Sequence, residues 1–188
     1  MPNPALDPTR SGGRLTNHSQ HADTASAPTK EGQMRIERLE DIAKEFDERV
    51  RGIASATATT VDTKGRPFSR MLHPIWEGAV GWIATGRNTL KTKHLAKNPY
   101  LALSYWTPAQ DTVMMQCRAE WCDDAATKSR IWALFRNTPE PVGYDPQHFW
   151  RGGLDDPSFG VLKLTPRRIE LWTGQEVMAG TPPKVWLA

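Results

Sequence analysis

Residues 66–120 constrain the fold more than any other stretch, because strand-like runs bracket one short helical segment rich in basic and hydroxyl side chains. Thr85 closes an apolar run, and Asn88 stands where the N-cap of the next helix is expected. The basic and hydroxyl side chains of the next turn or so are Arg87, Thr89, Lys91 and Lys93. Because a helix start has unpaired N–H groups and a partial positive charge, this segment predicts a cradle for a phosphate.

Further strand-like runs lie on both sides of this segment. Together the predicted strands cover residues 54–61, 66–76, 79–85, 100–106, 112–121, 159–166 and 167–174. Turn signals separate the early ones, at Asp62 to Gly65 and at Glu77-Gly78. The number of strands and their hairpin spacing predict a mainly β protein with helices, built as an antiparallel closed or split β-barrel.

Three helices are expected beside the strands. Residues 35–51 are amphipathic and should cover one mouth of the barrel, and residues 88–97 should stop before Pro99. Asp123 and Asp124 open the third helix, and carboxylates at that position are expected to cap a helix rather than to act in catalysis.

Residues 137–158 form a long loop with an aromatic centre that includes Tyr144, Phe149 and Trp150. A long aromatic loop fits two interpretations, a lid on the substrate side or a plug that seals the barrel, and the pattern leaves both open.

The chain divides into three parts by composition. Residues 1–34 are rich in small and polar residues and predict a disordered arm. Residues 35–178 hold the strands and helices and predict one domain with one core, and residues 179–188 predict a tail.

Composition and motifs also exclude several classes. The net charge of +3 is mild and has a local use in the cradle, so no nucleic-acid partner is expected. The sequence contains neither a long apolar run nor a leader-like apolar segment, which predicts a cytoplasmic protein with no membrane partner. Cys117 and Cys122 lie five apart on one strand and should point to opposite faces, so neither a disulfide between them nor a metal site is expected.

Three sequence segments carry a family resemblance. They are RPFSRML at 66–72, WIATGRNTLKTKHLAKNP at 82–99, and ALSYW at 102–106 followed by VMMQCRAE at 113–120. Over roughly residues 50–175 this wording resembles the pyridoxamine 5'-phosphate oxidase-like split-barrel family, which binds FMN. The resemblance implies an FMN-binding split barrel over the central domain.

The resemblance also implies which residues contact the cofactor. Arg70, Thr89 and Lys91 would hold the FMN phosphate. The backbone that would border the ribityl chain and ring belongs to Met71, Leu72, Ala84 and Thr85.

Three further positions are candidates, and a fourth, His94, is not. Thr112 starts the fifth strand, where true oxidases of the family carry glutamine, and is placed among the cofactor-binding residues. Trp172 matches an aromatic that reaches the flavin from the partner subunit, although a core tryptophan would look the same. His73 either faces the flavin or is hydrogen-bonded within the barrel, and His94 is expected to face solvent.

Two further departures, besides Thr112, separate the chain from true oxidases of the family. Leu90 stands where they carry a second basic residue before the lysine. The chain ends EVMAGTPPKVWLA, without the Arg-x-His-Asp-Arg type of motif that grips the vitamin phosphate. A flavin site is therefore expected without the activity that names the family.

The sequence thus predicts a homodimeric, FMN-dependent oxidoreductase that acts on a small molecule, with no catalytic residue that can be named. One alternative is an F420-dependent reductase on the same barrel, in which Arg87 and Lys93 would serve the acidic tail of that cofactor. A second alternative is a flavin- or haem-binding protein without turnover. Eight tryptophans, several on predicted strands, favour a dimer because one small core is unlikely to enclose them all.

Overall fold

A computed structural model describes residues 32–188, which contain nine strands, four α-helices and two short 3₁₀ turns. The strands are β1 (Met34–Ile36), β2 (Ala56–Val61), β3 (Pro67–Leu72), β4 (Ile75–Glu77), β5 (Val80–Gly86), β6 (Tyr100–Trp106), β7 (Thr112–Cys122), β8 (Phe159–Trp172) and β9 (Lys184–Leu187). The helices are α1 (Glu40–Arg51), α2 (Leu90–Leu95), α3 (Ala125–Asn137) and α4 (Gly174–Met178). The first 31 residues of the expected arm lie outside the described part of the chain.

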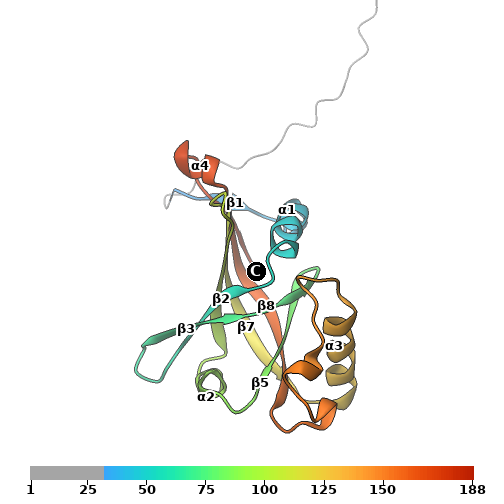
Figure 1. Cartoon of the computed structure of the whole chain (residues 1–188). Helices are drawn as coiled ribbons and strands as arrows, with labels where there is room; N and C mark the ends of the chain where they lie inside the picture. Colours follow the sequence, from blue (N-terminus) through green and yellow to red (C-terminus); the bar gives the residue numbers. More distant parts are fainter. Residues whose placement is uncertain (1–31) are drawn as a thin grey trace, which may run out of the picture.

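One curled sheet organises the molecule (Figure 1). Its strand order is β1-β9-β8-β7-β6-β2-β3. Strand β8 pairs with β5 along its first half and with β9 along its second half, and both partners lie on the same edge of β8. All neighbours are antiparallel except β1 and β9. The predicted fold class, a mainly β antiparallel split barrel with helices, is confirmed.

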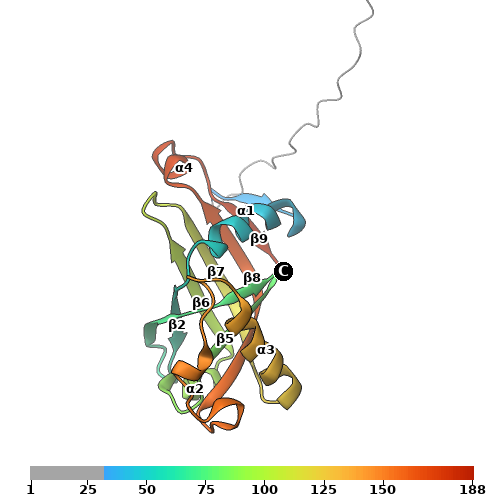
Figure 2. The same ribbon diagram turned by 45° about the vertical axis from the view of Figure 1, so that its right-hand side comes forward.

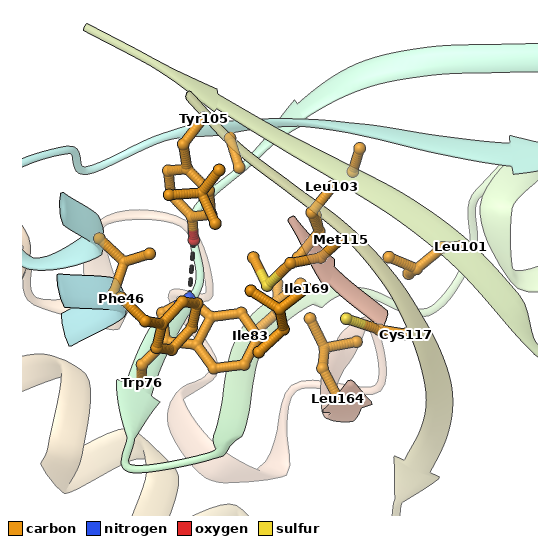
Figure 3. Close-up of a cluster of buried hydrophobic side chains, with 14 of the residues drawn as sticks. Phe46, Trp76, Ile83, Leu101, Leu103, Tyr105, Met115, Cys117, Leu164 and Ile169 are labelled. Carbon is orange, nitrogen blue, oxygen red and sulfur yellow. Dashed lines mark hydrogen bonds between the residues drawn. The ribbon is translucent and has the colours of Figure 1, made fainter. Parts of the chain in front are cut away.

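Side chains that alternate along the strands fill the main core (Figure 3). The inward residues of β6 and β7 include Leu103, Tyr105 and Met115, all nearly inaccessible to solvent. The indole of Trp76 donates a hydrogen bond of 2.8 Å to the Tyr105 hydroxyl, which satisfies both buried polar groups. Phe46 of α1 packs edge-on against Trp76, so the apolar face of α1 packs on the main core.

A second cluster lies under α3, on the other face of β5 and the first half of β8. The Asp124 side chain caps α3 by accepting a hydrogen bond from the Thr127 amide, as expected of that carboxylate. Ile131, Trp132 and Phe135 then bury one face of the helix.

Several element boundaries differ from the sequence prediction. Residues 159–166 and 167–174 were predicted as two strands but form the single strand β8, since a register shift between Gln116 and Cys117 accommodates Pro166 and Arg167. Residues 66–76 split into β3 and β4 at His73-Pro74. Helix α1 starts later than predicted because residues 34–36 pair with β9.

The C-terminal segment 179–188, expected to be a tail, contains β9, which pairs with both β8 and β1. Helix α2 is shorter than the predicted 88–97, and its N-cap is Thr89 instead of Asn88. Cys117 and Cys122 are both free thiols, as expected. Within residues 32–188 no helix is long and apolar enough to cross a membrane.

Candidate anion-binding site

Lys91 is the centre of the candidate site, because its side chain is buried in the turn between β5 and α2. The residue is only 7% exposed. Its ammonium donates hydrogen bonds to the Gly86 carbonyl at 3.2 Å and to the Thr89 hydroxyl at 2.9 Å. An ammonium has three N–H groups, so one of them is left for another acceptor.

The environment of Lys91 opposes its positive charge. Burial, together with repulsion from the nearby Arg70 guanidinium, lowers the pKa of Lys91 to about 8. Throughout residues 32–188, no carboxylate forms an ion pair with either Lys91 or Arg70. Two neighbouring cations that share no counter-ion are an arrangement that an anion would stabilise.

Arg70 reaches this site from the edge strand β3. Its Nη1 donates to the Thr60 hydroxyl at 2.8 Å and, more weakly, to the Ala58 carbonyl at 3.4 Å. The Nε and Nη2 hydrogens make no hydrogen bond within the described residues and remain available to a ligand. Partial burial lowers the pKa of Arg70, which nevertheless stays charged.

Two more sequence candidates lie on β5, immediately before the Lys91 turn. Ala84 packs into the cluster under α3. Thr85 is 7% exposed, and its hydroxyl makes no hydrogen bond with the described part of the chain. The site therefore has an uncommitted hydroxyl as well as uncommitted cationic donors.

Met71 and Leu72, the two residues that follow Arg70 on β3, face opposite sides of the strand. Leu72 packs against the main core. Met71 is 60% exposed and accepts a weak hydrogen bond from the Thr57 hydroxyl at 3.6 Å. Met71 thus presents an apolar surface on the face of β3 opposite to the Arg70 side chain.

Thr112 and Trp172 lie together but far from Lys91 in the same chain. They face each other where β7 begins and β8 ends, close to α4, whereas α2 lies at the opposite end of these strands (Figures 1 and 2). Arg49 of α1 donates to both of their carbonyls, at 3.0 and 3.2 Å. The Trp172 indole donates to the Thr181 carbonyl at 2.9 Å. The structure therefore divides the nine sequence candidates into two groups.

The prediction for His94 was wrong, and the structure explains why. His94 is 5% exposed, its Nδ1 lies 2.9 Å from the Thr60 hydroxyl, and its ring packs against Phe68. Neither Thr60 nor His94 was recognised as part of the site from sequence. The one available signal was that His94 follows Lys91 by three residues, which places both on the same face of a helix.

Two other candidates are engaged elsewhere. His73 contacts the rings of Phe135 and Tyr144, and its Nε2 approaches the Val142 carbonyl, so it belongs to the cluster around the aromatic loop. Arg87 pairs with Asp123 at 3.0 Å and stacks 4.2 Å from the Trp121 ring. The candidate site is therefore formed by Lys91 and Arg70, without His73 or Arg87.

The aromatic loop mainly seals the second cluster. Trp150 is buried against Phe159, and Tyr144 packs on Phe135. Phe149 is 70% exposed and faces solvent. No group of three or more His, Cys, Asp or Glu side chains in residues 32–188 is arranged to hold a metal ion.

Fold and site together define a split-barrel protein with a pair of uncompensated cations beside the β5–α2 turn. The sequence model of the family described as Pyridoxamine 5'-phosphate oxidase matches residues 42–173. The chain belongs to this family. No curated protein sequence matches it.

Solved structures share the fold at low sequence identity. A protein related to general stress protein 26 from Clostridium acetobutylicum is 20% identical with a TM-score of 0.61, covering 72% of this chain and 90% of that one. A pyridoxamine 5'-phosphate oxidase-related, FMN binding protein from Nostoc punctiforme is 16% identical with a TM-score of 0.53, covering 77% and 86%. A heme binding protein from Mycobacterium smegmatis is 17% identical with a TM-score of 0.54, covering 69% and 53%.

Proposed function

We propose that this protein binds FMN and acts as an FMN-dependent oxidoreductase on a small molecule, with the cofactor phosphate held by Arg70, Thr89 and Lys91. The observation that carries the proposal is the pair of neighbouring cations, Arg70 and Lys91, that no carboxylate within residues 32–188 neutralises. Bound FMN would supply hydride or electron transfer, while the protein binds and orients it.

The donors at the site suit a phosphate monoester in charge and number. Such a phosphate carries between one and two negative charges at neutral pH. The third Lys91 hydrogen and the free guanidinium edge of Arg70 would each form charge-assisted hydrogen bonds, of about 1.5–3 kcal/mol apiece. Two or three such bonds, together with burial of the flavin ring, support micromolar or tighter binding.

We propose a homodimer because one face of the sheet exposes several large apolar side chains. Met71, Thr57, Ser104 and Met114 face one another in register across β3, β2, β6 and β7. Trp106, further along the same face of β6, is 60% exposed. A second copy covering this face would remove these side chains from water and could bring its own Thr112 and Trp172 to the flavin.

Titration of the purified protein with FMN, F420 and haem, followed by absorbance and fluorescence, tests the choice of cofactor. We expect FMN to bind most tightly. Arg87, which an F420 tail would need, is already paired with Asp123. Saturable binding of haem or F420 with none of FMN would overturn the proposal.

A second experiment separates an enzyme from a binding protein without turnover. The FMN-loaded protein is reduced with NADH, NADPH or dithionite under anaerobic conditions, and reoxidation by candidate acceptors is followed at the flavin absorbance band. An enzyme should be reoxidised faster by at least one small-molecule acceptor than free reduced FMN is. Equal rates for all acceptors would leave a binding role only.

A further inference from the structure

We infer that Thr60 and His94 are positioning residues that hold the Arg70 guanidinium toward the cofactor phosphate without neutralising it. This inference rests on the proposed FMN site and names residues outside it. Thr60 is on β2 and is 1% exposed, and His94 is on α2 and is 5% exposed. Together with Arg70 they form a hydrogen-bonded relay through three different elements.

The chemistry of the three groups gives the relay a direction. Arginine can only donate, so the Thr60 oxygen accepts from Nη1 at 2.8 Å. The single hydroxyl proton of Thr60 is then free to point at Nδ1 of His94, 2.9 Å away. The arrangement that satisfies all three groups therefore runs from Arg70 to Thr60 to His94, with the ring hydrogen of His94 on Nε2.

Arg70 needs such an anchor because of where it lies. Strand β3 pairs only with β2, so Arg70 is on an edge strand with solvent on one side. A long side chain there has many rotamers of similar energy, and fixing it before the ligand arrives improves affinity. The buried, β-branched Thr60 offers a fixed acceptor, because few χ1 rotamers are open to it.

The choice of neutral partners is the functional part of the relay. A carboxylate would orient Arg70 equally well but would cancel its charge. A hydroxyl backed by an imidazole orients the guanidinium and leaves its full positive charge to the ligand. His94 also shares α2 with Lys91, and the Phe68 ring packs against it at 5.1 Å, so one short helix positions both cations.

The test is a double-mutant cycle on FMN affinity, with melting temperatures recorded for each variant. We expect Thr60→Val to weaken FMN about five- to tenfold and Thr60→Ser, which keeps the hydroxyl, to bind almost like the wild type. In an Arg70→Ala background, Thr60→Val should have no further effect. Thr138→Val serves as the control. This substitution also removes a hydroxyl hydrogen bond, of 2.7 Å to the Leu134 carbonyl, but Thr138 lies at the end of α3 and makes no hydrogen bond with Arg70.

A second measurement is independent of the cofactor. In the cofactor-free protein, NMR titration of the Lys91 side chain reports on Arg70, because Arg70 contributes to the low pKa of Lys91. Releasing Arg70 by Thr60→Val should raise that pKa, and Thr60→Ser should not. If the wild type does not bind FMN, the proposed function is wrong. The Lys91 titration alone then tests whether Thr60 positions Arg70.

Two results would overturn the relay. One is a Thr60→Val variant in which Lys91 has the same pKa as in the wild type and FMN binds with the same affinity. If the wild type does not bind FMN, the unchanged pKa of Lys91 alone is that result. The other is an equal loss of FMN affinity from Thr60→Val with and without Arg70, which would mean that Thr60 supports the fold and not the guanidinium.

Discussion

Replacing Lys91 by methionine should stabilise the cofactor-free protein and weaken its binding of FMN. Methionine keeps the unbranched aliphatic stem that fills the turn between β5 and α2, and it removes the buried charge. A gain in stability with a loss of binding is the expected signature of a charge retained for a ligand. An ordinary exposed lysine would show neither effect.

The size of both effects follows from the structure. The pKa of Lys91 falls from 10.5 to about 8, and each pH unit corresponds to about 1.4 kcal/mol. Solvent near the mouth of the site screens the charge, so we expect a stabilisation of about 1–2 kcal/mol, or about 3–6 °C in melting temperature. Loss of one charge-assisted bond of about 1.5–3 kcal/mol should weaken FMN by roughly tenfold or more.

The pH dependence gives an independent check on the same residue. Because the folded pKa of Lys91 is lower than the unfolded one, the unfolded chain binds more protons between about pH 8 and 10.5. The destabilising effect of Lys91 is therefore present in full below pH 8 and is relieved as the pH rises through that window. FMN affinity should fall over the same window, because the ammonium loses its charge.

The assay combines FMN titration by fluorescence quenching with thermal unfolding of the cofactor-free protein between pH 7 and 10. Lys97→Met is the matched control, since Lys97 is exposed just beyond α2 and forms no ion pair in the described chain. The reasoning is refuted if Lys91→Met binds FMN like the wild type. It is also refuted if both lysine variants shift affinity and melting temperature equally.

Four other outcomes are expected. The FMN-loaded protein should not oxidise pyridoxamine 5'-phosphate, because Lys184, the one basic residue near the C-terminus, is engaged with carboxylates; formation of pyridoxal 5'-phosphate would contradict this. Sedimentation should show a dimer, and Trp172→Ala should keep the dimer but change the bound-flavin spectrum; a monomer with FMN bound would exclude this arrangement. Tyr105→Phe should lower the free energy of unfolding in urea by about 1–3 kcal/mol, because the Trp76 indole loses its acceptor, and an unchanged midpoint would speak against that bond. Cys117 should react with a thiol reagent only on unfolding, since burial raises its pKa to about 12, and fast labelling of the native protein would disprove its burial.

The strands of the barrel were largely predictable because hairpin strands alternate in burial and end at turns. The predicted runs 100–106 and 112–121 match β6 and β7 within one residue. The failure at β8 has a specific cause, since the predicted break falls after Pro166, a residue that cannot donate to the ladder and is unusual inside a strand. A bulge in β8, opposite Gln116 and Cys117, removes that constraint, and a bulge depends on the neighbouring strand rather than on local sequence.

The candidate site was only partly predictable. The spacing from Thr85 to Lys91 indicated a cradle, and the structure does bring Arg70, Thr89 and Lys91 together. Burial of Lys91 could not be read from the sequence, because α2 has six residues and is too short to show an amphipathic period. The relay partner Thr60 lies ten residues before Arg70 on another strand, so only the pairing of β2 with β3 brings the two together.

The two ends of the barrel are connected through the proposed dimer. Arg70 and Lys91 lie at the α2 end, whereas Thr112 and Trp172 lie at the α4 end, where Arg49 holds the carbonyls of both. A flavin that contacts both groups would need one from each copy, because a single chain keeps them apart. Cofactor binding and dimerisation would then be linked, since each stabilises the state that the other requires. The protein has a reason to keep an uncompensated Lys91, because the bound cofactor phosphate would relieve the destabilising charge and thereby strengthen this linkage.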